Sequence, residues 1–398
     1  MLYNLPSNCL FGNAPTPIEL PDDWDVTVCS FKGENAPVLS RADIEEQLRA
    51  NPAFEDAKGA KDAVIMFEDT TRPTYFGDIA EIIVDILEEA GVPSEAIRFM
   101  AAVGTHRCMT YPDKVVKLGK RICDNYDVFS HNPFYGCEYV GTTSQGIRVE
   151  LNRDCINADF KVALGTLSPH PGMGIGGAGK IVAVGVASLE TIVQSHQAAP
   201  HRWTLDAPVL QDNYEAADML GVNLFVNTIL NGAGEISYLY AGGCREVHQE
   251  SFDTLWDFYE TPACDECDIV IANEYFKAPE PGTGLALTGV SDSVREGGIL
   301  IDSFNTPQYV APHYGNGVWG QVDGVVGPFF RGHKKIAPNV GKMLVFSTTI
   351  DRAVAYSYLP LKDGAIICRT WEDVLSHIEP GPKKVAIYPY TVVSRLVR

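Results

Sequence analysis

The chain has 398 residues, of which 45% are hydrophobic and 21% are charged, a balance that is typical of a folded protein and excludes one that is mainly disordered. Its length favours two domains over one. Asp and Glu number 51 against 31 Lys and Arg, so the formal charge is −20. Because that charge repels phosphate groups, we expect neither nucleic acid nor an anionic membrane surface as a partner.

The sequence predicts neither a membrane-targeting segment nor a redox-active cysteine pair. No apolar run is long enough for a transmembrane helix, and the first residues lack the basic and apolar regions of a secretory signal. The ten cysteines are scattered. The lone CxxC pair, Cys264 and Cys267, has no second pair at zinc-ribbon spacing, so we interpret these residues as reduced thiols. The cytoplasm is the predicted compartment.

Strands alternate with helices along the first half of the chain. Short apolar runs predict buried strands at 63–67, 97–103 and 160–164. Helical apolar spacing predicts a helix over 79–87, and another helix should begin near Tyr111. This alternation indicates an α/β fold with a parallel sheet flanked by helices.

Polar segments follow all three predicted strands, at 69–72, 104–107 and 168–180. In parallel sheets, ligands bind beyond the carboxyl ends of the strands, so these segments predict a functional site. After the third segment, Ser188 is a candidate N-cap for a helix that carries His196 and ends near residue 199.

The second half of the chain predicts another α/β sheet. Its apolar runs lie at 268–272, 298–302, 342–347 and 364–368, and one more lies at 385–388.

We place the domain boundary near residue 258. This gives an N-terminal α/β catalytic domain of residues 1–257 and a C-terminal α/β domain of residues 258–382. The sequence leaves open whether residues 383–398 return to the first domain.

The segment Ser168–Lys180, SPHPGMGIGGAGK, contains two nucleotide-loop patterns, neither of which we favour. A G-x-G-x-x-G run starts at Gly174, but the preceding strand ends too early, near Leu164. A G-x-x-x-x-G-K run is followed by Ile181 instead of the Ser or Thr that holds magnesium. The glycines would let the backbone approach a flat or anionic ligand, with Lys180 as a reactive or phosphate-facing group. A flexible surface loop is the plain alternative.

Three of the nine histidines stand out by context. His106 and His170 lie on loops after predicted strands, and His196 lies on the helix after Lys180. Imidazole binds nickel, zinc, copper and iron and titrates near neutral pH. The residues alone leave two interpretations open, a metal shared by all three histidines or one ligand with two acid–base groups. Arg72 is suited to binding a carboxylate, with a surface ion pair as the alternative.

Together these segments resemble the lactate racemase family, the nickel-pincer 2-hydroxyacid racemases and epimerases. The matching residues are Asp69-Thr70-Thr71-Arg72-Pro73, Gly104-Thr105-His106-Arg107 with Thr110, Pro169-His170, the Gly-rich run to Lys180, and His196. Their order and spacing match the family pattern. The resemblance is close over residues 60–250 and looser elsewhere.

The resemblance implies a two-domain α/β protein with its active site in the cleft between the domains. It also implies a nickel-pincer nucleotide, a pyridinium-3-thioamide-5-thiocarboxylate mononucleotide that holds nickel in a planar pincer. The implied activity is inversion of C2 of a 2-hydroxy acid by proton-coupled hydride transfer to that cofactor. We expect cofactor-building enzymes as partners, and we expect protein made in a host without them to lack the cofactor.

The resemblance also assigns roles to individual residues. Lys180 would be the covalent tether and His196 the nickel ligand, and His106 and His170 would be the paired acid–base groups. Arg72 would bind the substrate carboxylate. The implied cofactor-binding set comprises Lys180, Asp69, Thr71, Gly176, Gly177 and Gly179.

Departures from the family pattern predict a substrate other than lactate. The family's second domain usually carries a Tyr-Gln pair and a lysine, whereas residues 273–280 here read NEYFKAPE, without that pair. Lys277 lies in a comparable region. Two other classes stay open: a zinc-dependent hydrolase or lyase that uses His106, His170 and His196 as ligands, and a protein that binds a hydroxy acid without turnover.

Overall fold

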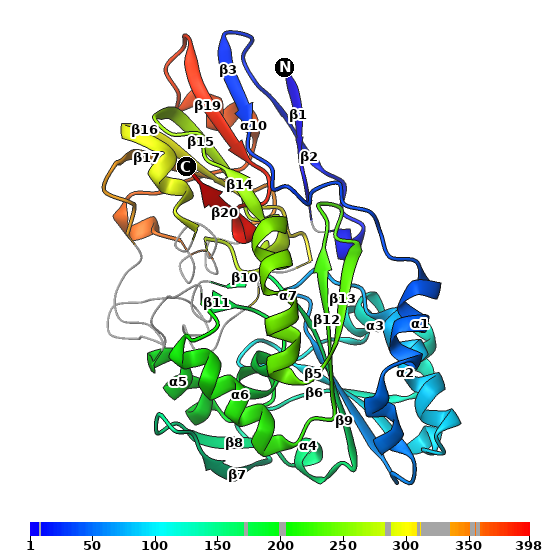
Figure 1. Cartoon of the computed structure of the whole chain (residues 1–398). Coiled ribbons are helices and arrows are strands. Elements are labelled where there is room, and N and C mark those ends of the chain that lie inside the picture. The colour runs from blue at the N-terminus through cyan, green and yellow to red at the C-terminus, as the bar shows by residue number, and fades with distance from the viewer. Residues whose placement is uncertain are drawn as a thin grey trace. The chain divides into compact units, whose positions relative to one another are not determined.

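The computed structural model describes residues 1–7, 9–170, 174–198, 204–282, 288–308, 311, 335–350, 355 and 359–398. The chain forms two compact units (Figure 1). The central unit comprises Asn35–Leu255, and the terminal unit combines Met1–Glu34 with Trp256–Arg398.

The central unit contains a six-stranded mixed sheet in the order β13-β12-β9-β4-β5-β6. Its strands are β4 (Ala63–Glu68), β5 (Ile97–Ala102), β6 (Asp127–Ser130), β9 (Phe160–Thr166), β12 (Leu224–Leu230) and β13 (Ile236–Gly242). Neighbouring strands are parallel except β12 and β13, which form an antiparallel pair. The carboxyl ends of β4, β5 and β9 therefore lie at one edge of the sheet.

Helices flank this sheet, as the alternating pattern predicts. The helices are α1 (Arg41–Arg49), α2 (Gly77–Glu89), α3 (Tyr111–Asn125), α4 (Arg153–Asn157), α5 (Leu189–Ala198), α6 (Pro208–Leu220) and α7 (Cys244–Phe258). Figure 1 shows α1 to α3 together on one side of the sheet and α5 and α6 on the other. A separate hairpin pairs β7 (Cys137–Thr142) with β8 (Arg148–Asn152).

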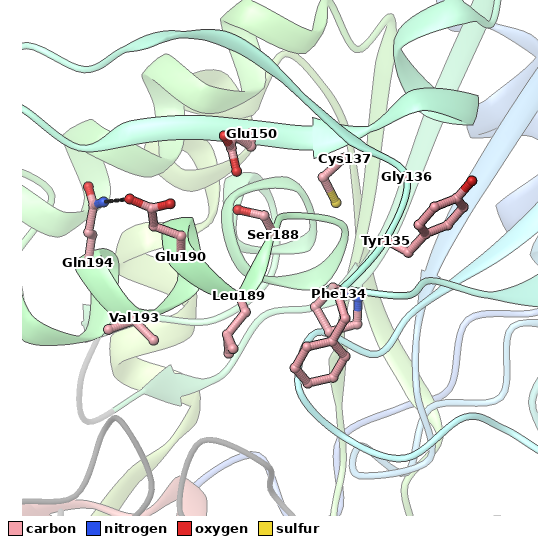
Figure 2. A pocket seen from close by; sticks show the side chains of 11 residues that line it. Phe134, Tyr135, Gly136, Cys137, Glu150, Ser188, Leu189, Glu190, Val193 and Gln194 are labelled. Carbon is pink, nitrogen blue, oxygen red and sulfur yellow. Dashed lines mark hydrogen bonds between the residues drawn. The ribbon is translucent and has the colours of Figure 1, made fainter.

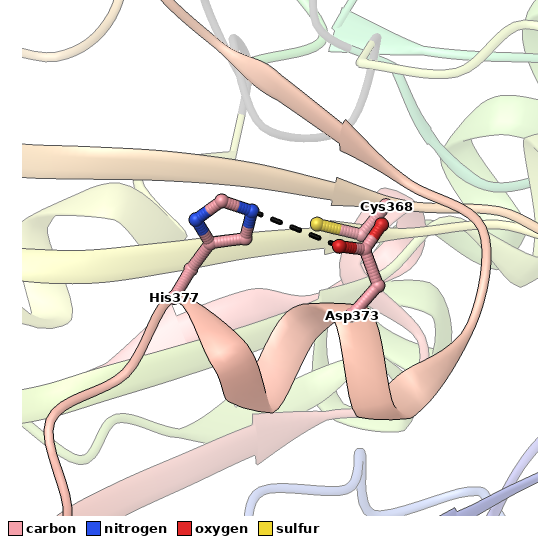
Figure 3. Close-up of side chains that lie close together, drawn as sticks. All are labelled: Cys368, Asp373 and His377. Carbon is pink, nitrogen blue, oxygen red and sulfur yellow. Dashed lines mark ion pairs between the residues drawn. The ribbon is translucent and has the colours of Figure 1, made fainter.

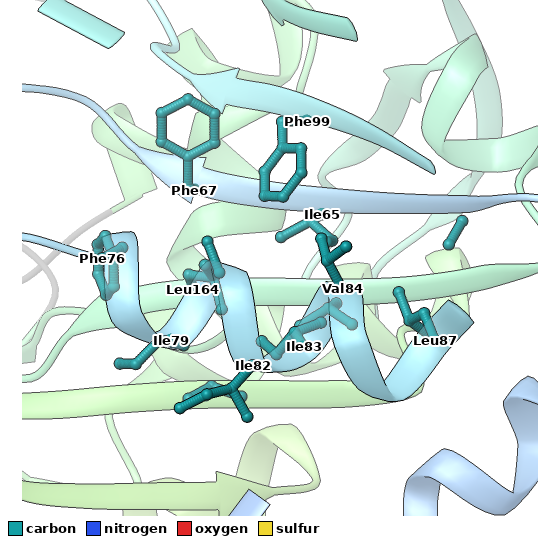
Figure 4. Close-up of a cluster of buried hydrophobic side chains, with 14 of the residues drawn as sticks. Ile65, Phe67, Phe76, Ile79, Ile82, Ile83, Val84, Leu87, Phe99 and Leu164 are labelled. Atoms are coloured by element: carbon teal, nitrogen blue, oxygen red, sulfur yellow. The ribbon is translucent and has the colours of Figure 1, made fainter. Parts of the chain in front are cut away.

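The apolar face of α2 packs against the hydrophobic core of the central sheet. All six residues of β4 are buried, so this strand contacts protein on both faces. The apolar side chains of α2 recur at helical spacing and pack in one cluster with those of the sheet. Figure 4 shows Ile79, Ile83 and Leu87 of α2 gathered with Phe67 of β4 and Phe99 of β5.

The terminal unit contains a second six-stranded sheet, parallel throughout, in the order β18-β17-β16-β15-β19-β3. Its strands are β3 (Trp24–Val28), β15 (Cys267–Asn273), β16 (Val294–Ser303), β17 (Val340–Phe346), β18 (Ile366–Cys368) and β19 (Lys383–Tyr388). Two small sheets pair β1 (Leu2–Leu5) with β2 (Thr16–Glu19) and β14 (Glu260–Pro262) with β20 (Arg395–Val397). One helix, α10 (Trp371–Ser376), follows β18.

The predicted α/β class is confirmed, and every apolar run predicted as a strand contains one. The division of the chain differs from the predicted one at its N-terminal end. Residues 1–34 belong to the terminal unit because β3 pairs in parallel with β19, with Val28 opposite Ile387. The pairing of β19 with β15 also places the start of segment 383–398 in that unit. The predicted cleft between domains stays a prediction.

Within the described ranges, no helix is long and apolar enough to cross a membrane.

One glycine of the central unit offers a direct test of close packing. Gly104 has a φ of +53°, and a Cβ there would lie 2.8 Å from the carbonyl oxygen of Val184. We expect Gly104→Ala to lower the free energy of unfolding by about 2–4 kcal/mol, because a left-handed backbone and an overpacked contact both cost stability. The measurement is urea unfolding.

The matched control is Gly221→Ala in the same unit. Gly221 has a φ of +69°, and a Cβ added there would have no neighbour within 4 Å, so only the backbone cost of about 1 kcal/mol applies. Equal destabilisation by the two variants would contradict the close approach at Gly104.

Candidate active site

The predicted site residues follow neighbouring parallel strands. Asp69, Thr71 and Arg72 lie just after β4, and His106 lies just after β5. The Gly-rich segment with Lys180 follows β9, which pairs with β4 on its other side. Three loops therefore leave the sheet at one edge, where α/β proteins bind ligands.

Asp69 and His106 form the closest contact between these loops. Asp69 Oδ2 lies 2.7 Å from His106 Nδ1, and the carboxylate is buried. Its other oxygen accepts hydrogen bonds from the Thr71 amide at 3.0 Å and from the Thr71 hydroxyl at 2.5 Å. Because an ionised carboxylate only accepts hydrogen bonds, Nδ1 of His106 carries the proton and Nε2 is the nitrogen available as a base.

The charge state of Asp69 follows from its surroundings. Burial opposes ionisation, but the charge and hydrogen bond of His106, the Thr71 hydroxyl and the Arg72 charge together hold the pKa of Asp69 well below its usual range. The carboxylate is therefore ionised throughout the neutral range.

Arg72 is held beside this pair. Its Nη1 donates to the Thr71 hydroxyl at 2.9 Å and to the Thr71 carbonyl at 3.3 Å. The Arg72 carbonyl in turn accepts from Lys117 Nζ at 3.1 Å. Backbone and side chain are both fixed, which suits a group that must orient a carboxylate.

A buried ionic network that the sequence analysis missed lies at the end of β4. Glu68 accepts hydrogen bonds from the Thr166 amide at 2.9 Å and the Thr166 hydroxyl at 2.5 Å, which ties β4 to β9. The same carboxylate lies 3.3 Å from Lys117 Nζ, so α3 is tied in as well. Burial lowers the pKa of Lys117 below its ordinary value, and the charges of Glu68 and Asp69 oppose that shift.

The Gly-rich segment packs closely against two buried residues, the Asn227 side chain and the Asn213 backbone. Its beginning forms a short antiparallel pair, β10 (Pro169–His170) with β11 (Gly174–Ile175). The Ala178 amide then donates to Asn227 Oδ1 at 2.8 Å. A Cβ on Gly177 would lie 2.5 Å from that oxygen, and one on Gly179 would lie 2.6 Å from the Asn213 carbonyl. These two glycines are therefore required by close packing.

Lys180 comes directly before a single π-helical turn, η4 (Ile181–Gly185), and its side chain is partly exposed. The end of this turn reaches the His106 loop, because the Gly104 amide donates to the Gly185 carbonyl at 2.9 Å. π-Helical turns are rare and frequently mark functional sites. The segment with Lys180 thus lies against the loop with His106.

His196 lies on α5, where Ser188 caps the helix as predicted and its hydroxyl accepts from the Thr191 amide at 3.2 Å. His196 Nδ1 lies 2.7 Å from the Ile192 carbonyl. That contact requires a proton on Nδ1, so Nε2 is the nitrogen that can bind a metal.

Two further histidines, His131 and His248, are buried in the central unit. His131 is buried between the Ala187 carbonyl and Asn152, and burial lowers its pKa to about 4. These contacts indicate a structural role for His131. His248 is also buried, its Nδ1 lies 2.8 Å from the Tyr214 hydroxyl, and burial lowers its pKa to about 4.

A single zinc ion shared by His106, His170 and His196 is not supported. Across the described ranges, only one set of three ligating side chains has its ligand atoms within 4.8 Å of one another, and it contains none of these histidines.

A surface pocket of about 570 Å³ lies elsewhere, between residues 133–137 and the start of α5. Phe134, Glu150 and Leu189 are among its lining residues (Figure 2). None of the predicted site residues lines this pocket.

Comparisons with known proteins relate this chain to the lactate racemases. The family model described as the lactate racemase N-terminal domain matches residues 11–205. The lactate racemase of Thermoanaerobacterium thermosaccharolyticum is 24% identical over 309 residues, covering 73% of this chain and 72% of the relative. The lactate racemase of Lactiplantibacillus plantarum is 26% identical over 280 residues, covering 66% of each chain. The chain is a distant relative of the lactate racemases. This relation supports an isomerase of the racemase or epimerase type that acts on a small molecule.

Two solved structures share the fold of this chain. The lactate racemase apoprotein from T. thermosaccharolyticum matches with a TM-score of 0.72 at 19% identity, covering 100% of both chains. A protein from Thermotoga maritima matches with a TM-score of 0.67 at 19% identity, covering 92% of this chain and 100% of that chain.

The buried Asp69 carboxylate predicts a specific pH dependence. Because its pKa is lower in the folded than in the unfolded protein, its stabilising contribution is fully present above about pH 5. The contribution declines as the pH falls from about 4 toward the lower pKa of the folded protein. We expect Asp69→Asn to cost about 2 kcal/mol at pH 7 and clearly less at pH 3, measured by urea unfolding.

The surface variant Asp56→Asn is the control, and its effect should be small at both values. A penalty for Asp69→Asn that is equal at pH 7 and pH 3 would contradict the ionised, buried pair.

Proposed function

We propose that the protein is a racemase or epimerase that inverts C2 of a 2-hydroxy acid with a nickel-pincer nucleotide tethered to Lys180. The observation that carries this proposal is the hydrogen-bonded pair of Asp69 and His106, beside Arg72 and against the segment that begins at Lys180. The pair supplies a base, and the arginine supplies a site for a carboxylate.

The residues at this edge fit the proposed cofactor. Asn227 Nδ2 is buried beside Gly177 of the Gly-rich segment and has no hydrogen-bond partner among the described residues. Buried polar atoms of that kind are costly unless a ligand or water satisfies them. Gly176, which has only ordinary contacts around a Cβ position, leaves backbone open to a flat ligand.

Lys180 would hold the cofactor covalently, and His196 would ligate nickel through Nε2, a donor type that nickel accepts. When bound, the cofactor supplies an electrophilic centre that can accept hydride from C2 of the substrate. We place Thr71, Gly176, Gly177 and Gly179 along its binding surface.

The protein's own groups would perform the remaining steps. Arg72 holds the substrate carboxylate in a fixed orientation. His106 Nε2 takes the hydroxyl proton, and Asp69 stabilises the imidazolium that forms. The substrate is then a planar 2-keto acid. His170 acts in the same way for the opposite enantiomer, so two imidazoles serve the two faces.

The terminal unit supports a substrate other than lactate. The family's Tyr-Gln pair is missing from residues 273–280. Lys277, in a comparable region, is buried and lies 3.1 Å from Glu280, so its charge is paired within that segment. A larger or more polar 2-hydroxy acid is therefore the proposed substrate. We keep the cytoplasm and the cofactor-building enzymes as the proposed compartment and partners.

The test is enantiomer exchange by protein made together with the cofactor-building enzymes, using a panel of chiral 2-hydroxy acids. We expect His106→Ala and His170→Ala each to lower the exchange rate at least about 100-fold, because a positioned general base contributes on that order. In D2O the product should keep its original hydrogen at C2.

Lys58→Ala, on the surface of the same unit, is the control and should exchange at the normal rate. Full activity in either histidine variant, or deuterium from solvent at C2, would contradict the proposal.

A further inference from the structure

A second group of ligating side chains lies in the terminal unit, outside the proposed active site. Cys368 ends β18, and Asp373 and His377 follow on and just after α10. Within the described part of the chain, this is the one set of three whose ligand atoms all lie within 4.8 Å of one another. Figure 3 shows the three side chains on the same side of α10.

The spacing of these residues suits one metal ion. Asp373 and His377 are four residues apart on one helix face, and Oδ1 and Nε2 lie 3.8 Å apart. Two such atoms bound tetrahedrally to zinc at about 2.1 Å are ~3.4 Å apart, so a small rotation of either side chain closes the site.

The backbone that carries these ligands is held in place. Thr370 caps α10 by accepting from the Asp373 amide at 3.1 Å. Trp371 donates to the Glu19 carbonyl at 2.7 Å and packs edge-on against Phe346. Lys342 donates to the His377 carbonyl at 2.6 Å, which fixes the end of the helix. The three ligands are therefore presented by a rigid strand–helix unit.

Exposure differs across the group in a way that suits a metal at the surface. The Cys368 side chain is fully buried, whereas the Asp373 and His377 side chains are 46% and 33% exposed. An ion held between them would have the sulfur on its inner side and a position open to water on its outer side. Thiolate, imidazole and carboxylate together are a donor set typical of zinc.

We propose that Cys368, Asp373 and His377 form a zinc site that joins the edge strand β18 to α10. The zinc would have three protein ligands and one water. These three residues differ from those that would hold nickel. The zinc site can therefore be tested independently of the proposed racemase activity.

The test uses cobalt(II) as a spectroscopic probe of zinc sites, added to the full chain after treatment with a chelator. We expect one equivalent of cobalt with a thiolate-to-cobalt charge-transfer band, displaced by one equivalent of zinc. Cys368→Ser should abolish that band. The surface variants Asp373→Asn and His377→Gln, which leave the buried thiol in place, should each weaken binding at least about tenfold.

Two controls separate this site from other thiols and from the proposed nickel ligand. Cys264→Ser removes one of two sulfurs that lie 3.5 Å apart in the CxxC pair, and His196→Ala removes the active-site imidazole. Both should keep the band and the affinity of the unaltered chain. Absence of the band in the unaltered chain, its persistence in Cys368→Ser, or unchanged affinity in His377→Gln would overturn the proposal.

Discussion

The arrangement of the candidate site depends on two consecutive buried carboxylates at the end of β4. Glu68 receives the amide and hydroxyl of Thr166, and Asp69 receives those of Thr71 together with His106. Glu68 thus ties the end of β4 to the end of β9, and Asp69 ties the loop after β4 to the loop after β5. Without these bonds, two negative charges would be buried at adjacent positions, which is strongly unfavourable.

The positive charges around these carboxylates explain how the cost of burial is offset. Lys117 reaches Glu68 and also the carbonyl of Arg72, so one ammonium group links α3 to both sides of the loop. Arg72 and His106 provide the charge that keeps Asp69 ionised. The same contacts fix the tautomer of His106 and the position of Arg72. Stability and the proposed chemistry therefore rest on one network, and a change in it should affect both.

Much of the fold could be predicted because local patterns were strong. The apolar run at 63–67 and the helical spacing over 79–87 led to β4 and α2, and Ser188 led to the start of α5. The edge strand β3 was missed because it has only one buried residue, Trp24, and because its partner β19 lies more than 350 residues away in the chain. Pairing over that distance leaves no local signal.

The sequence predicted candidate site residues only where they belong to a recognisable motif. Glu68 was missed because it is the last residue of an apolar strand, although it directly precedes the Asp69 motif. Lys117 was missed because a lysine on a helix normally faces solvent. Asn227 did leave a signal, since it is a polar residue inside the apolar run LFVNTIL of β12. A buried amide in such a strand indicates a hydrogen bond to something outside the sheet, here the Ala178 amide.

The proposed racemase activity requires that Lys180 anchors the cofactor at the carboxyl ends of the strands. The decisive measurement is intact mass and nickel content of protein made together with the cofactor-building enzymes. We expect one covalent adduct and one nickel per chain, both retained in Lys58→Arg and both lost in Lys180→Arg. A mass equal to that of the bare chain, or an adduct that persists in Lys180→Arg, would contradict it.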